Sequence, residues 1–140
     1  MNEKEIKKKI ATLTYFHNPL STGNGSTRIA KYTCNPPLYN KYKNVIVKCY
    51  NFGNCYKSVL YENDSKTGML LDIGAKRDYF AFFLMNMLNM DCAPKIIKEF
   101  DMEFNHVLPL VKLGYDIKLS EEQKNSPWKF ATEMAIGDIK

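Results

Sequence analysis

Hydrophobic and polar residues alternate most clearly in two neighbouring segments, residues 45–51 and 55–61, which are separated by Phe52-Gly53-Asn54. Alternation with a period of two is typical of a β-strand, and a three-residue connection containing glycine is typical of a β-hairpin. If residue 51 pairs with residue 55, one face carries Val45, Val47, Cys49, Lys57, Val59 and Tyr61, and the other carries Ile46, Lys48, Tyr50, Tyr56, Ser58 and Leu60. Both faces are mixed, so the pattern does not identify the buried one.

Two further strands are predicted at residues 27–34 and 68–73, and together with the hairpin they form an antiparallel meander. A stretch rich in turn-forming residues, 18–26, precedes the first of them, and Asn35-Pro36-Pro37 ends it. At the N-terminus, Ile6, Ile10 and Leu13 have helical spacing and predict a helix over residues 3–13. Residues 13–16 also suit a first strand, and the pattern leaves this boundary open.

The second half of the chain predicts helices. Asp78 is placed to cap a helix over residues 79–90, which is apolar almost all round, with Asn86 and Asn89 as the polar exceptions. Such a helix either lies in the centre of the core or commits part of its surface to a partner. We favour the core interpretation.

Three more helix signals follow along the chain. Pro94 begins a helix that is expected to extend to about residue 104. Ser120 and Gln123 have the spacing of a capping box, in which each side chain bonds an otherwise unpaired backbone N–H group. Ser126-Pro127-Trp128 begins a last helix, which Gly137 is expected to end.

The 140 residues are 45% hydrophobic and 25% charged, which is ordinary for one globular domain. The fold class predicted for residues 1–140 is α+β, with an N-terminal helix, an antiparallel β-meander of three to five strands and a C-terminal helical layer packed on the sheet. The basic helix and sheet part covers residues 1–74, and the mainly helical part covers 75–140. The sequence contains neither a run of about 20 apolar residues nor a secretory signal, so a cytoplasmic location is expected.

Charge divides unevenly along the chain. Residues 1–60 carry ten Lys or Arg against two Asp or Glu, whereas residues 61–140 carry ten against thirteen. This asymmetry favours a polyanion or an acidic protein surface as the partner of the first part, although a solvated basic face explains it equally well. Only Arg28 and Arg77 are arginines, which argues against base-specific contacts in a DNA groove.

Lysines alternate with tyrosines in the basic part, where lysine can neutralise phosphates and tyrosine can stack on unpaired bases. Alternatively, the tyrosines simply cover a half-buried sheet. The candidate contact residues are Lys7, Lys8, Lys9, Arg28, Lys31, Tyr39, Lys41, Tyr42, Lys43, Lys48, Tyr50, Tyr56 and Lys57.

Catalytic chemistry has little support in the sequence. His17 and His106 are the only candidates for acid–base catalysis near neutral pH, and we expect His106 to be packed in the core. No serine or cysteine lies in a nucleophile motif, and no cofactor or metal site is expected. The four cysteines, Cys34, Cys49, Cys55 and Cys92, are interpreted as small buried residues, with a Cys49–Cys55 bridge as the alternative.

The sequence therefore favours a non-enzymatic binding module that docks electrostatically on a nucleoprotein complex, a protein with an acidic surface, or RNA or DNA. In general style it resembles accessory proteins of phages and mobile elements that inhibit host defence complexes by occlusion; the analogy depends on no motif. One alternative is a protein that binds single-stranded nucleic acid without sequence specificity. A further alternative is a small metal-independent ribonuclease that uses His17 and His106.

Overall fold

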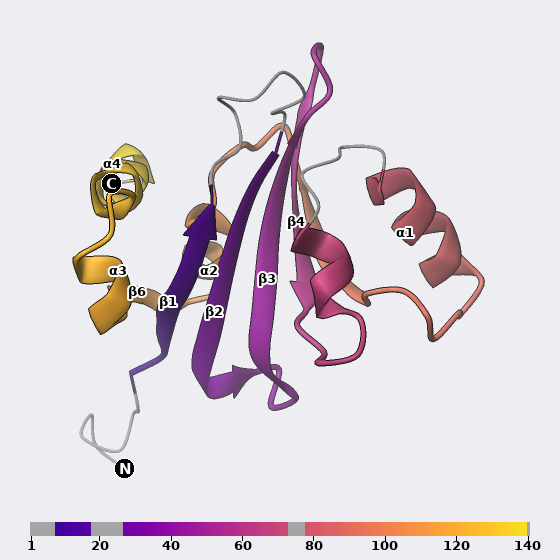
Figure 1. Ribbon diagram of the computed structural model, residues 1–140, viewed down its shortest axis with the longest axis horizontal. Coiled ribbons are helices and arrows are strands. Elements are labelled where there is room, and N and C mark those ends of the chain that lie inside the picture. The colour runs from indigo at the N-terminus through magenta and orange to yellow at the C-terminus, as the bar shows by residue number, and fades with distance from the viewer. Residues whose placement is uncertain (1–7, 18–26, 73–77, 140) are drawn as a thin grey trace.

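The computed structural model describes residues 8–17, 27–72 and 78–139, which form a six-stranded sheet with helices on both faces (Figure 1). The strand order is β5-β4-β3-β2-β1-β6, and the first five strands pair antiparallel in sequence order, whereas β6 joins β1 in parallel. The strands are β1 (Ile10–His17), β2 (Thr27–Leu38), β3 (Tyr42–Asn51), β4 (Tyr56–Glu62), β5 (Ile96–Asp101) and β6 (Asp116–Leu119). The helices are the 3-10 helix η3 (Gly68–Asp72), α1 (Asp78–Met87), α2 (Leu108–Lys112), α3 (Glu121–Lys124) and α4 (Lys129–Ile139). The mixed α+β class is thus confirmed.

Strand β1 replaces the C-terminal part of the predicted N-terminal helix, and the rest of that prediction lies outside the described residues. Ala11 and Leu13 point into the core, while Thr12 and Thr14 alternate with them. Two neighbours stabilise the extended form, since β1 pairs with β2 on one edge and with β6 on the other. Ile10 and Leu13 have the spacing expected of a helix only by coincidence, because both belong to a strand.

The hairpin of β3 and β4 is confirmed, but its register differs by one residue from the assumed one. Asn51 pairs with Tyr56, not with Cys55. Because neighbouring side chains in a strand point to opposite faces, this shift moves all of β4 to the other side. Ser58 and Leu60 now share a face with Val47, and both faces become buried.

Two other elements were predicted incorrectly. The stretch expected as a third strand, 68–73, folds as the 3-10 helix η3 as far as Asp72. The helix expected after Pro94 is the edge strand β5, which pairs antiparallel with β4. Strand β2 also continues through Pro36 and Pro37, where its pairing with β3 is interrupted and the missing N–H groups of proline are tolerated.

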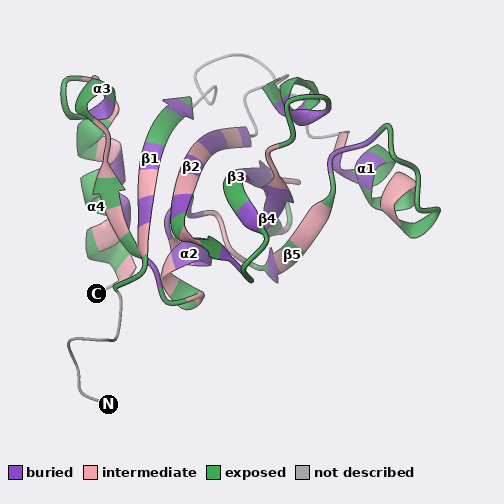
Figure 2. Cartoon of the chain, turned by 90° about the horizontal axis from the view of Figure 1, so that it is seen from below, coloured by how far each residue is buried: buried purple, intermediate pink, exposed green. Residues whose placement is uncertain are grey.

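The sheet separates two hydrophobic cores. One contains Leu13, Tyr32, Val47 and Leu60 and is covered by α2 and α4, with Trp128 and Ala131 packed against it. The other contains the residues Ile29, Ile46, Tyr50, Val59, Tyr61, Leu71, Tyr79, Phe82 and Ala93, and is covered by η3 and α1. The C-terminal helices therefore do not form one layer. Figure 2 shows α1 at one end of the molecule with much of its surface exposed, while α4 lies at the other.

The last two helix signals are confirmed in part. Ser120 caps α3 by accepting a hydrogen bond of 3.3 Å from the backbone N–H of Gln123, but Gln123 Oε1 is buried without a hydrogen-bond partner among the described residues, so the reciprocal bond of the predicted capping box does not form. Helix α4 begins directly after Trp128 and continues through Gly137 to Ile139, so Gly137 does not end it. None of the described helices is long and apolar enough to cross a membrane.

Candidate binding surfaces

Four of the cations predicted to bind a partner, Lys8, Lys31, Lys48 and Lys57, already have an acidic partner within the protein. Lys31 Nζ lies 2.9 Å from Asp72, and Lys8 Nζ lies 3.2 Å from Asp116. In addition, Lys57 lies 3.0 Å from Glu99 and also contacts Asp101, while Lys48 lies 2.5 Å from Asp78. Every one of these carboxylates comes from the second half of the chain. Folding therefore pairs four cations of the basic part with carboxylates of the second half.

Lys48 and Tyr50 lie inside the protein and are left out of any contact surface. Both side chains are 0% exposed, and both bond to Asp78 at the start of α1. Tyr50 also shares a hydrogen bond of 2.8 Å with Tyr61. Burial lowers the pKa of Lys48 and raises that of Asp78, and their mutual contact opposes both effects. This network attaches α1 to the sheet.

Two other predicted contacts, Arg28 and Tyr42, are also engaged within the fold. The Arg28 guanidinium lies 4.6 Å from the centre of the Phe104 ring, and Tyr42 is buried in the core beside α2. Burial opposes the charge of Lys57, but the hydrogen bonds to Asp101 and Glu99 raise its pKa. Tyr56 is exposed near Phe104, at the end of the sheet where β3 turns into β4.

Five predicted residues lie toward the opposite end of the sheet, in the segment before β1 and in the turn between β2 and β3. Ile10 pairs with Asn35 at this end, whereas Lys8 itself forms its ion pair with Asp116 of β6, on the other edge of β1. We call this group the basic end; it consists of Lys8, Lys9, Tyr39, Lys41 and Lys43, all exposed. Lys7 lies outside the described residues.

The turn between β2 and β3 forms the tip of the basic end. Tyr39 and Asn40 have positive φ values of 53° and 58°, and backbone hydrogen bonds from Asn40 to Pro37 and from Lys41 to Leu38 close the turn. This conformation leaves the Tyr39 ring 58% exposed. Among the described residues, Lys41 and Lys43 form no ion pair with a carboxylate, so their charges face solvent.

The two histidines are not arranged alike. His106 is buried, stacks on Phe16 with the ring centres 4.0 Å apart, and its Nε2 lies 3.0 Å from Thr132 Oγ1. Burial lowers its pKa to about 3, so the ring is neutral at physiological pH. His17 is exposed at the end of β1. A packed, neutral His106 does not favour the ribonuclease alternative.

Helix α1 presents an apolar surface that the core interpretation did not anticipate. Tyr79 and Phe82 face the sheet and Met85 packs partly against the same core, but Phe80, Phe83, Leu84 and Met87 face outward. We call the exposed set the apolar face; it consists of Phe80, Phe83, Leu84 and Met87 of α1 with Leu88 and Met90 of the segment that follows it, all between 41% and 64% exposed. Tyr79, Phe82 and Asn86 recur at helical intervals on the side toward the sheet, but the exposed Phe80, Leu84 and Met87 do so as well, so spacing alone does not identify the buried side.

Asn86 holds the end of α1 in place. Its side-chain nitrogen donates to the carbonyls of Phe82 and Pro94, at 2.7 and 2.9 Å, and its oxygen accepts from the backbone N–H of Ile96 at 2.9 Å. Together with the Asp78 network at the other end, these bonds fix α1 against β5. The apolar face is thus a preorganised surface.

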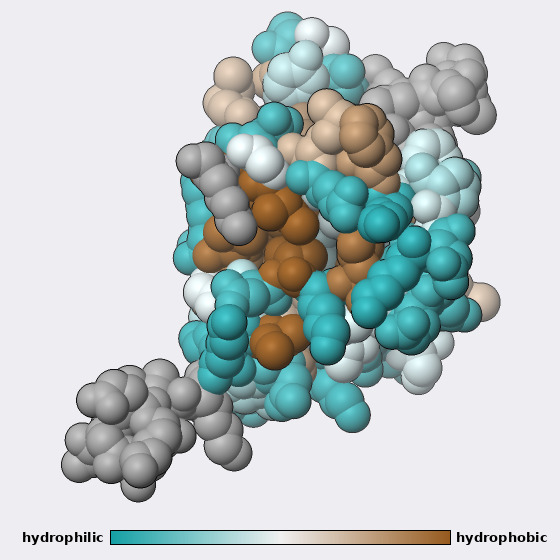
Figure 3. All heavy atoms as spheres, turned by 90° about the vertical axis from the view of Figure 1, so that its left-hand side faces the viewer, coloured by the Kyte–Doolittle hydropathy of each residue, from teal (hydrophilic) through white to brown (hydrophobic). Residues whose placement is uncertain are grey.

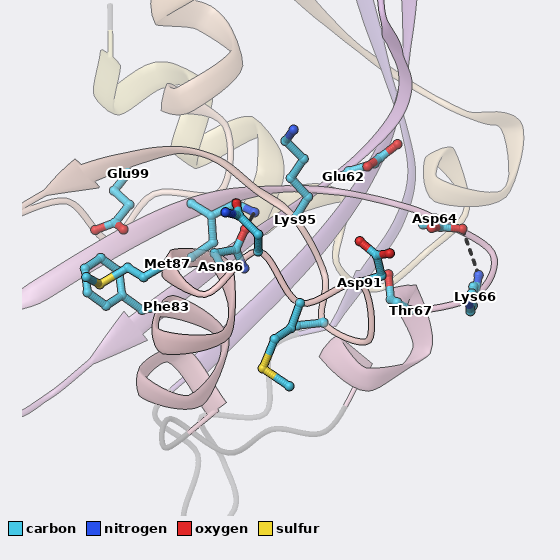
Figure 4. A pocket seen from close by; sticks show the side chains of 14 residues that line it. Glu62, Asp64, Lys66, Thr67, Phe83, Asn86, Met87, Asp91, Lys95 and Glu99 are labelled. Carbon is cyan, nitrogen blue, oxygen red and sulfur yellow. Dashed lines mark hydrogen bonds between the residues drawn. The ribbon is translucent and has the colours of Figure 1, made fainter.

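A pocket of about 740 Å³ opens beside the apolar face, between the end of α1, the start of β5 and the segment after β4 (Figure 4). Phe83, Met87 and Met90 supply its apolar wall. The polar wall contains Glu62, Asp64, Asp91 and Glu99 with Lys66 and Lys95. Such a recess can receive a side chain of a partner that docks on α1.

The opposite side of the molecule is different in character. Figure 3 shows the side that carries α3 and α4, where apolar surface is interrupted by hydrophilic side chains. Phe130 and Met134 of α4 are exposed there.

The four cysteines are free; Cys34 and Cys49 are buried as expected, whereas Cys55 is half-buried and Cys92 is exposed, contrary to expectation.

Comparison of the chain with protein-family models, with curated proteins and with solved structures gave no match in any of the three. Within the part of the chain that the structure describes, His, Cys, Asp and Glu side chains form no group of three or more that could hold a metal ion. The geometry of the basic end and of the apolar face therefore carries the functional argument.

Proposed function

We propose that the protein is a non-enzymatic binding module that docks on nucleic-acid phosphates, either in a nucleoprotein complex or in free single-stranded RNA or DNA. The basic end is the contact surface. The observation that carries this proposal is the exposed tip of Tyr39, Lys41 and Lys43, with Lys8 and Lys9 exposed toward the same end of the sheet.

The chemistry of the tip suits an unpaired strand. Lys41 and Lys43 have no competing carboxylate among the described residues, so phosphates can approach them without displacing an internal partner. Tyr39 offers an exposed ring on which a base can stack, and stacking of this kind is largely independent of sequence. Lys8 and Asp116 are both well exposed, and such a surface ion pair contributes little and exchanges easily.

The proposed surface is smaller than the sequence predicted. Lys31 and Lys57 are engaged by carboxylates, and Lys48 is buried, so none of the three is included. Binding is accordingly expected to be modest, with affinity set by a few phosphate contacts. Occlusion of a host defence complex stays a prediction of the sequence analysis.

A salt series tests the proposal. Fluorescence anisotropy of a labelled single-stranded oligonucleotide is measured with the purified chain from low to physiological salt. Four phosphate contacts on a single strand predict a slope of about −3 in a plot of log binding constant against log salt. Absence of binding at the lowest salt, or binding that does not change with salt, would contradict electrostatic docking.

A further inference from the structure

We propose that the apolar face of α1 is a self-association surface, on which a second copy of this chain packs its own α1 antiparallel about a two-fold axis. The inference is independent of nucleic-acid binding, because the apolar face and the basic end share no residue.

The size of the apolar face suits a protein interface. With accessible areas of roughly 150–250 Å² for large side chains, the exposed fractions of its six residues correspond to about 600 Å². The largest apolar patch on a typical monomer covers about 300–600 Å², and a standard interface takes about 800 Å² from each partner. The apolar face is therefore at the upper limit for a free surface, and it supplies most of one half of a dimer interface.

The charge pattern of α1 suits pairing with itself. Residues 79–90 contain no charged side chain, so two copies of the helix bring no like charges together. Asp78 precedes this segment but is neutralised by Lys48. Asp91 follows it and is exposed, and in an antiparallel pair it lies beside the positive N-terminal end of the partner's helix. The two ends of the helix are thus electrostatically complementary.

The same pattern argues against a membrane as the occupant. Helices that lie on membrane surfaces usually carry lysine or arginine along the polar side, which contacts anionic headgroups. Residues 79–90 contain neither. Preorganisation also favours a rigid protein partner, because the Asp78 network and Asn86 fix both ends of α1 before binding and little conformational entropy is lost.

Light scattering coupled to size-exclusion chromatography tests the inference on the full chain from low to high micromolar concentration. We expect the parent to have twice the mass of one chain. Leu84→Glu places a carboxylate in the centre of the interface and is expected to weaken association by roughly a hundredfold. Met134→Glu, at a similarly exposed position on α4, is the matched control and should remain dimeric. Unchanged circular dichroism and thermal unfolding verify that both variants fold.

Cross-linking tests the antiparallel geometry. Residue 84 lies midway along the apolar face, near the proposed two-fold axis, so Leu84→Cys in a Cys92→Ser background should form an intermolecular disulfide with diamide. Met134→Cys in the same background should not. Two results would overturn the inference. One is a parent that is monomeric at every concentration, including a monomer that sediments with anionic phospholipid vesicles. The other is a Leu84→Glu variant that remains dimeric.

Discussion

At the scale of single residues, the main determinant of this surface is the pairing of charges from distant parts of the chain. Lys57 meets Asp101 because the two are direct partners in the register of β4 and β5. Lys48 meets Asp78 because α1 begins above the middle of β3. Neither relation is visible in local sequence, since both depend on elements that the sequence assigned incorrectly or could not position.

The buried pair of Lys48 and Asp78 leads to a stability prediction. Lys48→Met removes the cation and leaves the half-buried Asp78 carboxylate without its main partner, which is expected to cost about 3–5 kcal/mol in the free energy of unfolding. Urea unfolding monitored by circular dichroism measures the change. Lys41→Met at the exposed tip is the control and should change stability by less than about 0.5 kcal/mol. A loss for Lys48→Met no larger than that control would show that the pair is unimportant.

His106 leads to a prediction about pH. Its pKa falls from 6.5 to about 3 on folding, so below pH 6.5 the unfolded chain binds a proton that the folded protein does not. The free energy of unfolding is therefore at its full value above about pH 6.5, where His106 is neutral in both states. It decreases as the pH falls from 6.5 toward 3, by up to about 1.4 kcal/mol per pH unit. Urea unfolding between about pH 6.5 and 5, above the main range of carboxylate titration, measures this slope.

His106→Gln is the comparison for that slope. The variant is expected to be less stable at neutral pH because it loses the stacking on Phe16. The slope of its unfolding free energy against pH should be smaller than that of the parent, because unfolding of the variant takes up nearly one proton fewer. Equal slopes in the parent and the variant would mean that His106 titrates normally and is not buried as described.

At the scale of elements, local patterns predicted what is determined locally. The β-hairpin, the strand that begins at Thr27, the helix at α1 and the cap at Ser120 all depend on neighbouring residues, and all are present. The errors occurred where tertiary pairing overrides local preference. Residues 96–101 are stabilised as a strand only because β4 offers an edge, and the hairpin register follows from burial on both faces.

Helix α1 leads to a prediction about local stability. Asn86→Ala removes two hydrogen bonds that join α1 to Pro94 and Ile96, and a third to Phe82 within α1, and should cost about 2–3 kcal/mol. Hydrogen exchange should show faster exchange at the Ile96 amide, which loses its acceptor, while the amides between β1 and β2 keep their order of protection. Unchanged exchange at Ile96 would show that α1 does not depend on Asn86.

At the scale of the whole molecule, fewer of the predicted cations remain available than the sequence suggested, because folding pairs Lys31 and Lys57 with carboxylates and buries Lys48. The candidate residues that remain exposed at the basic end, Lys8, Lys9, Tyr39, Lys41 and Lys43, come from two segments that lie toward the same end of the sheet. The apolar face was recognised as one of two possibilities, but helical spacing alone could not show whether another element covers it. Another element covers a helix surface only if the chain returns over it. Here the chain after α1 runs directly into β5, where Asn86 bonds Pro94 and Ile96.

The most direct test of the account compares two charge reversals in the same salt series. Lys41→Glu with Lys43→Glu alters the tip, whereas Lys124→Glu with Lys129→Glu makes the same change in net charge on α3 and α4. We expect the tip variant to lose binding to the single-stranded oligonucleotide and to reduce the steepness of the salt dependence by about 1.4, while the control retains most of both. Equal losses in the two variants would contradict a defined contact surface, because net charge alone would then account for binding.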